Sequence, residues 1–218
     1  ISHEFRTPLT LIIGQMEMLL QARTFAPSIY NRILGVYKNC LQMRELITEL
    51  LDFRKQEQGY MTIKVSEHNL VDFVYESYLL FQEYAAQRQI TFRFNKAQDV
   101  IPVWYDKKQL QKVMNNLISN AFKHTKEGGK ITVSIRKGNK EVVIEVTDNG
   151  SGIAQKDLNK IFDRFYRADK SRNKEVSGTG LGLAIARWII DCHDGEVLVE
   201  SKVGEGTIFT DKFRLFSA

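Results

Sequence analysis

Apolar residues recur at alternating steps of four and three along the first 58 residues, and this spacing restricts that segment to packed helices. The first apolar stripe contains Phe5, Leu9, Ile12, Met16 and Leu19. The second stripe contains Ile29, Ile33, Val36, Cys40, Met43, Ile47 and Leu50. Pro27 suits the first turn of a helix, so the pattern predicts two helices joined by a break around residues 23–28.

Two helices alone cannot bury both apolar stripes. We therefore predict that residues 1–58 form a homodimer in which two hairpins close a four-helix bundle. The alternative is a hairpin that packs against a second domain of its own chain. We place the helical hairpin at residues 1–60 and the second domain at residues 61–218.

The chain after Gly59 mixes short strands and helices without regular alternation. Strands are predicted at residues 62–65, 90–94, 103–105, 131–135, 142–146, 197–201 and 207–215. Helices are predicted at residues 69–87 and 179–192, and another begins after Asp106, which is the expected N-cap. This order favours an α+β fold, with a two-layer α/β sandwich following the helical hairpin.

Composition and charge narrow the class of protein. With 43% hydrophobic and 26% charged residues, the chain is an ordinary globular protein rather than a disordered one. Cys40 and Cys192 lie far apart, which argues against a zinc site and favours a reducing compartment. The net charge of +5 is too small to indicate direct nucleic-acid binding. No apolar run approaches the roughly 20 residues that span a bilayer, and the start at Ile1 within an apparent helix indicates a piece of a longer protein.

The second domain carries a pattern that indicates nucleotide binding. Three glycine clusters occupy residues 148–152, 178–182 and 204–207. Glycine lets backbone amides approach a ligand closely, and the middle cluster precedes an apolar helix whose N-terminus suits phosphate. Asn116 and Asn120 share one helix face, and Lys123 and His124 follow. These side chains suit a triphosphate with Mg²⁺, which prefers oxygen ligands.

The motifs together resemble those of one family. The runs NNLISNAFKHT, DNGSG, FDRF, GTGLGLAIA and GEGTIF resemble, in this order, the N, G and F boxes of the histidine-kinase catalytic domain. The run ISHEFRTPLTLI resembles the phospho-acceptor box of the same family. The resemblance covers essentially the whole chain, and the wording around the N box is similar to that of hybrid sensors, which carry their own receiver domain.

The resemblance implies a role for particular residues in binding ATP and Mg²⁺. Asp148 is expected to accept a hydrogen bond from the adenine amino group, and Gly152 to let the base approach the backbone. Asn120 is the expected Mg²⁺ ligand, while Asn116 and Lys123 are expected to bind phosphate oxygens. The remaining expected contacts lie in the same boxes and the segment between them: His124, Gly150, Phe162, Arg164, Gly178, Thr179, Gly180, Leu181, Gly182 and Thr207.

Residues 154–177 are expected to form a mobile lid over ATP. This segment is rich in basic residues, which suit a polyanionic ligand. The candidates for phosphate contact are Arg164, Arg167, Lys170 and Arg172. Phe162 and Phe165 are candidates for latching the lid against the body of the domain, although ordinary packing explains them equally well.

The resemblance makes His3 the phospho-acceptor. A neutral imidazole attacks the γ-phosphate through one nitrogen, and a carboxylate that holds the other N–H fixes the tautomer. Glu4 is the candidate for that carboxylate, and Thr7, one turn later, is the candidate for positioning a water against a phosphorylated partner. Of the other histidines, His68 is expected in a connection and His193 at a helix end, where a partly charged imidazole suits the helix dipole.

The implied function is an autokinase that phosphorylates His3 and passes the phosphoryl group to an aspartate of a response-regulator receiver domain. Phosphatase activity toward that partner is a further expectation. Such a chain is expected to be the cytoplasmic part of a membrane-anchored sensor, with the membrane segments outside this sequence. One alternative is an ATPase of the wider superfamily, in which a glutamate stands where Asn116 stands here. The other is a dimeric scaffold that has lost its activity.

Overall fold

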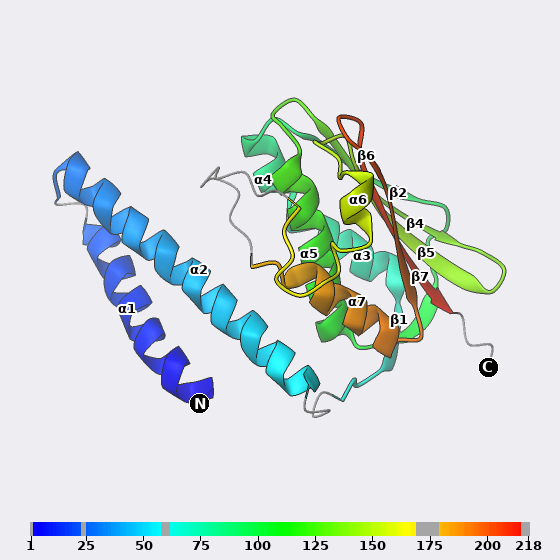
Figure 1. Cartoon of the computed structure of the whole chain (residues 1–218), viewed down its shortest axis with the longest axis horizontal. Helices are drawn as coiled ribbons and strands as arrows, with labels where there is room; N and C mark the ends of the chain where they lie inside the picture. Colours follow the sequence, from blue (N-terminus) through cyan, green and yellow to red (C-terminus); the bar gives the residue numbers. More distant parts are fainter. Residues whose placement is uncertain (1, 23–24, 58–61, 169–178, 215–218) are drawn as a thin grey trace. The chain divides into compact units, whose positions relative to one another are not determined.

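The computed structural model describes residues 2–22, 25–57, 62–168 and 179–214, and the chain divides into two compact units, residues 1–62 and 63–218 (Figure 1). In the first unit, α1 (Ser2–Ala22) and α2 (Pro27–Glu57) pack against each other. The Tyr37 hydroxyl of α2 donates to Glu17 Oε1 of α1 at 2.9 Å. Pro27 begins α2, as predicted. None of the helices described has the length and hydropathy needed to cross a membrane.

The second unit is built on a five-stranded sheet. Its strands, in spatial order, are β2 (Thr91–Lys96), β4 (Lys130–Lys137), β5 (Glu141–Asp148), β7 (Gly206–Arg214) and β6 (Glu196–Lys202). Only the β2–β4 pair is parallel. A separate two-stranded sheet pairs β1 (Ser66–Asn69) with β3 (Pro102–Tyr105).

The helices of this unit cover one face of the five-stranded sheet (Figure 1). They are α3 (Leu70–Leu79), α4 (Gln82–Gln87), α5 (Lys107–His124), α6 (Gln155–Leu158) and α7 (Gly182–Cys192). The apolar stripe of α5 is buried at the three- and four-residue steps of an amphipathic helix: Leu110, Val113, Met114, Leu117, Ile118, Ala121 and Phe122. The α+β fold predicted from the sequence is therefore confirmed.

Three predicted elements were placed wrongly. Residues 62–65 do not form a strand, because the pairing with β3 begins only at Ser66. The helix predicted at residues 69–87 is broken at Leu80 and Phe81, and the Phe81 ring stacks on Phe122 at 5.8 Å between centroids. The helix predicted from residue 179 begins at Gly182, because Gly180 has a left-handed φ of +74°.

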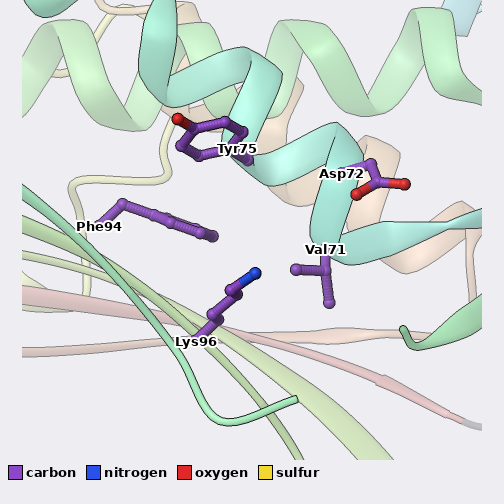
Figure 2. A pocket seen from close by; sticks show the side chains of 5 residues that line it. All are labelled: Val71, Asp72, Tyr75, Phe94 and Lys96. Carbon is purple, nitrogen blue, oxygen red and sulfur yellow. The ribbon is translucent and has the colours of Figure 1, made fainter. Parts of the chain in front are cut away.

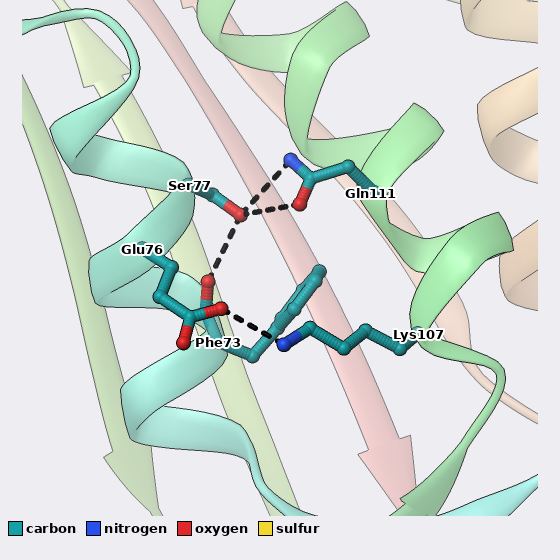
Figure 3. A network of polar contacts seen from close by, with 5 residues as sticks. All are labelled: Phe73, Glu76, Ser77, Lys107 and Gln111. Atoms are coloured by element: carbon teal, nitrogen blue, oxygen red, sulfur yellow. Dashed lines mark hydrogen bonds and ion pairs between the residues drawn. The ribbon is translucent and has the colours of Figure 1, made fainter.

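Polar side chains join α3 to α5 on the side of α5 that faces α3 (Figure 3). Ser77, which is fully buried, donates to the Phe73 carbonyl at 2.9 Å and accepts from Gln111 Nε2 at 3.1 Å. Nearer the start of α5, Lys107 forms an ion pair with Glu76 at 2.9 Å. These contacts fix the orientation of α5, the helix that carries Asn116 and Asn120.

His193 caps the end of α7 with both ring nitrogens engaged. Nε2 accepts from the Asp106 backbone N–H at 3.0 Å, so the ring proton sits on Nδ1 and is donated to the Ile189 carbonyl at 2.7 Å. His193 therefore lies at the end of a helix, as expected, with backbone groups at both ring nitrogens. His68 lies in β1 rather than in a connection, with its ring edge-on to Tyr105 at 5.5 Å.

Asp106 is the N-cap of α5, as predicted, and it also holds the start of the second unit. Oδ1 accepts from the Gln109 N–H at 3.1 Å, and Oδ2 accepts from the Lys64 N–H at 2.8 Å. Burial works against ionisation of this carboxyl, but the backbone N–H groups of Lys64, Gln109 and Lys108 outweigh it and lower the pKa of Asp106.

We expect Asp106→Ala to lower the free energy of unfolding by about 1–2 kcal/mol, the usual cost of losing an N-cap. Asp106→Asn should lose less, because its amide oxygen still accepts from Gln109. Urea unfolding at neutral pH measures both variants. Equal losses for Ala and Asn would show that the capping bond is not what stabilises this helix.

Candidate nucleotide-binding site

Three polar side chains form a row across the end of the five-stranded sheet. Thr207 of β7 lies directly opposite Asp148 of β5 on one side and opposite Ser201 of β6 on the other. Directly opposite residues of antiparallel strands project from the same face of a sheet. The row therefore joins the DNGSG turn to the GEGTIF turn, two of the glycine clusters that the sequence indicated.

Asp148 is held as a buried hydrogen-bond acceptor, with only 7% of its surface exposed. Oδ1 accepts from the Gly150 N–H at 2.8 Å, and the Thr207 N–H also donates to the carboxylate. Burial raises the pKa of Asp148 above its ordinary value, although these two backbone donors oppose the rise. Such an acceptor is suited to a ligand N–H.

The DNGSG turn is tied to α5 and to the β6–β7 turn. The Ser151 N–H donates to the His124 carbonyl at the end of α5, at 3.1 Å, and the Ser151 carbonyl accepts from the Gly204 N–H at 2.8 Å. Gly152 has a φ of +67°, and a Cβ there would overlap the Lys202 carbonyl. Glycine is therefore required at this position for the turn to pack against β6.

Asn116, one of the predicted side chains of α5, lies close to the middle glycine cluster. Asn116 and Asn120 are half-buried on one helix face, Lys123 is half-buried, and His124 is exposed. A Cβ on Gly182 would lie 2.7 Å from Asn116 Oδ1, so the start of α7 passes directly beside the amide. The structure thus brings the N box together with the GTGLGLAIA box.

The donor set fits Mg²⁺ held mainly through its ligand. Among the residues that the structure describes, no group of three His, Cys, Asp or Glu side chains could hold a metal ion unaided. Mg²⁺ keeps several waters and takes one or two protein oxygens together with substrate phosphates. The amide oxygen of Asn120, half-buried one turn from Asn116, is of that kind.

Phe165, which lies within the predicted lid of residues 154–177, contacts Gly180, which follows the lid. The Phe165 N–H donates to the Gly180 carbonyl at 2.9 Å, and a Cβ on Gly180 would lie 2.7 Å from the Phe165 carbonyl carbon. The Tyr166 hydroxyl donates to Asp157 of α6 at 2.7 Å. These contacts hold residues 165–166 against Gly180 and α6.

The two phenylalanines of the FDRF run behave differently. The Phe162 ring packs edge-on to Phe209 of the core at 6.4 Å and lies under the Arg187 guanidinium at 5.5 Å. The Phe165 side chain is 61% exposed, so the expectation that it latches the lid against the body is wrong for this structure. Its backbone, rather than its ring, makes the contact.

The structure gives less support to the remaining residues expected to contact the ligand. Leu181 is buried in the core, and its N–H donates to Thr179 Oγ1 at 3.0 Å. Arg164 and Arg167 are exposed. Gly178, Lys170 and Arg172 lie outside the described residues.

The residues of the predicted phospho-acceptor box lie in α1. The structure describes the backbone alone at His3 and Glu4, and the Thr7 side chain is exposed.

Sequence reasoning missed Ser201, whose side chain contacts three other residues of the site. Its Oγ accepts from the Ile153 N–H at 2.8 Å and lies 2.7 Å from the Gly206 carbonyl and 2.9 Å from Thr207 Oγ1. The sequence feature that could have indicated Ser201 is a polar residue near the end of a strand that is followed by a glycine turn.

A hollow elsewhere in the second unit has no relation to this site. Val71, Asp72 and Tyr75 of α3 line it together with Phe94 and Lys96 of β2 (Figure 2). None of the residues predicted to bind ATP lies there.

A buried acceptor at one end of the sheet and a neighbouring helix with two amide side chains are features of a nucleotide-binding site. The model of the histidine kinase-, DNA gyrase B- and HSP90-like ATPase family matches residues 105–216, and that of the His Kinase A (phospho-acceptor) domain matches residues 1–59. The chain therefore belongs to the histidine kinases and is a histidine-kinase catalytic core, as the motifs predicted.

Individual relatives agree with this assignment. Histidine kinase P4 of Formosa agariphila is 40% identical over 96% of this chain and 16% of its own length. The sensor histidine kinase WalK of Bacillus subtilis is 36% identical over 96% of this chain and 35% of its own length. The chain thus spans about a third or less of these two relatives.

Solved structures show the same fold. The catalytic domain of histidine kinase ThkA superposes with a TM-score of 0.62 at 31% identity, covering 69% of this chain and 95% of that one. ThkA in complex with the response regulator TrrA superposes with a TM-score of 0.69 at 26% identity, covering 97% of this chain and 59% of that one. The second likeness includes both units of this chain.

Proposed function

We propose that this chain is the core of a two-component sensor, which uses ATP to phosphorylate His3 and then transfers the phosphoryl group to an aspartate of a response-regulator receiver domain. The observation that carries the proposal is the buried acceptor Asp148 beside the end of α5, the helix that carries Asn116 and Asn120, on a chain whose first helix holds the phospho-acceptor box. The parent protein is proposed to be anchored in a membrane through segments outside this sequence.

The residues of the second unit would bind ATP at defined groups. Asp148 accepts from the exocyclic amino group of adenine, with Thr207 beside it. Asn116 and Lys123 bind phosphate oxygens, and Asn120 holds Mg²⁺ through its amide oxygen. When bound, Mg²⁺ neutralises phosphate charge and favours departure of the leaving group.

The transfer step uses the first unit. One nitrogen of the neutral His3 imidazole forms a bond to the γ-phosphorus while the bond to the bridging oxygen of ADP breaks. Glu4 holds or accepts the proton of the ring and stabilises the charge that develops there. In the proposed phosphatase reaction, Thr7 positions a water for attack on the phosphorylated receiver domain.

We further propose that residues 1–58 form the homodimer. Apolar side chains of both helices stay exposed on the single hairpin, although Leu9 and Ile13 are buried. The exposed set comprises Leu11, Ile12, Met18, Leu19, Ile29, Val36, Met43, Leu46 and Leu50. A second hairpin would cover this surface in a four-helix bundle.

Asn116 favours phosphotransfer over ATP hydrolysis. An amide cannot act as a general base at neutral pH. Free hydrolysis would require a carboxylate to activate water, and the residue beside Gly182 is Asn116. We therefore expect bound ATP to persist until the acceptor histidine reaches it.

A chase experiment tests this function. The chain is incubated with Mg²⁺ and ATP labelled at the γ-phosphate, freed of nucleotide, and mixed with purified receiver domains. Label should leave the chain and appear on a receiver domain, and a receiver whose acceptor aspartate is replaced should take none. Steady release of inorganic phosphate without labelled protein would favour an ATPase. The absence of both released phosphate and labelled protein would favour an inactive scaffold.

A further inference from the structure

The chemical nature of the partners of Ser201 determines which atom donates in each of its hydrogen bonds. A backbone N–H can only donate, so Ser201 Oγ is the acceptor for Ile153. A carbonyl can only accept, so the single Ser201 hydroxyl proton is given to Gly206 at 2.7 Å. The contact of 2.9 Å with Thr207 Oγ1 then has one solution, in which Thr207 is the donor.

This direction fixes the polarity of the Thr207 hydroxyl. Its proton points toward Ser201, away from Asp148 on the opposite side of the row. The Thr207 oxygen is left with lone pairs only, and Asp148 beside it is also an acceptor. The row therefore offers acceptors to a ligand and no hydroxyl donor.

We propose that Ser201 is a positioning residue that makes the site select adenine over guanine. The inference rests on the proposed function, since it concerns the base of the ATP bound there. Adenine carries an amino group at C6, which donates, whereas guanine carries a carbonyl, which needs a donor. With Ser201 in place, neither Thr207 nor Asp148 can supply one.

The test compares ATP and GTP binding to the whole chain by calorimetry, in wild type and in Ser201→Ala. In the variant the Thr207 hydroxyl is free to turn and donate toward a C6 carbonyl. We expect the ratio of ATP to GTP affinity to fall by about tenfold, since hydrogen-bond polarity is a main source of such discrimination. Ser201→Thr keeps the hydroxyl and suits a strand, so it should restore the ratio.

A matched control separates this effect from a general loss of packing. Ser134→Ala removes a half-buried strand serine on β4, whose hydroxyl contacts Glu145 at 3.4 Å, and should leave the ratio unchanged. Thr207→Val removes the hydroxyl that Ser201 orients, and it should lower the ratio without changing Ser201. If Ser201→Ala fails to fold, the affinity ratio of Thr207→Val tests the inference in its place.

The outcomes distinguish the inference from the function on which it rests. An unchanged ATP to GTP ratio in folded Ser201→Ala, or in Thr207→Val, overturns the inference and leaves ATP binding intact. Failure of Ser201→Thr to restore the ratio overturns it as well. A wild-type chain that binds no ATP removes the proposed function, and this inference with it.

Discussion

Asp148→Asn will weaken ATP binding by about 100-fold, because it leaves a buried hydrogen-bonding group mismatched at a cost of 2–3 kcal/mol. The carboxylate of Asp148 accepts from the backbone N–H groups of Gly150 and Thr207, and in the proposed function it also accepts from the adenine amino group. Asparagine has only one acceptor oxygen, so its NH₂ group must face one of these donors. Calorimetric titration with ATP at saturating Mg²⁺ measures the loss.

The same variant should remain folded. Burial raises the pKa of Asp148, which means that the folded protein disfavours its charge, and a neutral amide avoids that cost. Asp194→Asn is a matched control, since Asp194 is exposed and its left-handed φ of 52° suits asparagine. An Asp148→Asn chain that melts as wild type does and binds ATP within threefold of it would refute the role of Asp148.

Replacing the carboxyl of Asp211 with an amide will change how the free energy of unfolding depends on pH. Asp211 lies in the middle of β7 between Ile144 of β5 and Val197 of β6, and it is only 1% exposed. Neither carboxyl oxygen has a hydrogen-bond partner within the described part of the chain. Burial raises the pKa of Asp211 to about 8, so the folded protein holds the group protonated at neutral pH.

The sign of the effect follows from proton linkage. An unfolded aspartate ionises near pH 4 and the folded one near pH 8, so the unfolded state binds fewer protons in between. The contribution of protonated Asp211 to the free energy of unfolding is fully present below about pH 4 and is lost as the pH rises toward 8. Relative to Asp211→Asn, the free energy of unfolding of wild type should fall by ~1.4 kcal/mol per pH unit over this window.

Urea unfolding between about pH 5 and pH 8 measures this slope. Both tryptophans, Trp104 and Trp188, lie in the second unit, so their fluorescence follows the unfolding of that unit. Asp211→Val should also be more stable than wild type at neutral pH, because valine suits a buried strand and leaves no polar atom unpaired. A difference between wild type and Asp211→Asn that does not vary with pH would contradict this interpretation.

Local rules of sequence were sufficient for much of the fold. The two N-terminal helices, the N-cap at Asp106 and the alternating runs of the β4–β5 hairpin each depend on neighbouring residues alone, and the structure has them where the sequence placed them. The errors fell where tertiary contacts decide. Pairing with β3 sets the start of β1, and packing of Phe81 on Phe122 accompanies the break between α3 and α4.

The site shows the same division. The motifs pointed to Asp148 and Thr207, which the structure places side by side. Ser201 was missed because its role comes from strand register, which puts it opposite Thr207, and no motif contains it. The partner of His193 could not be predicted for a similar reason, since Asp106 lies 87 residues earlier in the chain.

The chemical identity of the phosphorylated residue is the most direct test of the central claim. Wild type and His3→Gln are incubated with Mg²⁺ and γ-labelled ATP, and the bound label is then exposed to acid and to base. We predict label on wild type that is stable in base and lost in acid, and no label on His3→Gln. Label that persists in His3→Gln, or that survives acid, would contradict histidine phosphorylation at this site.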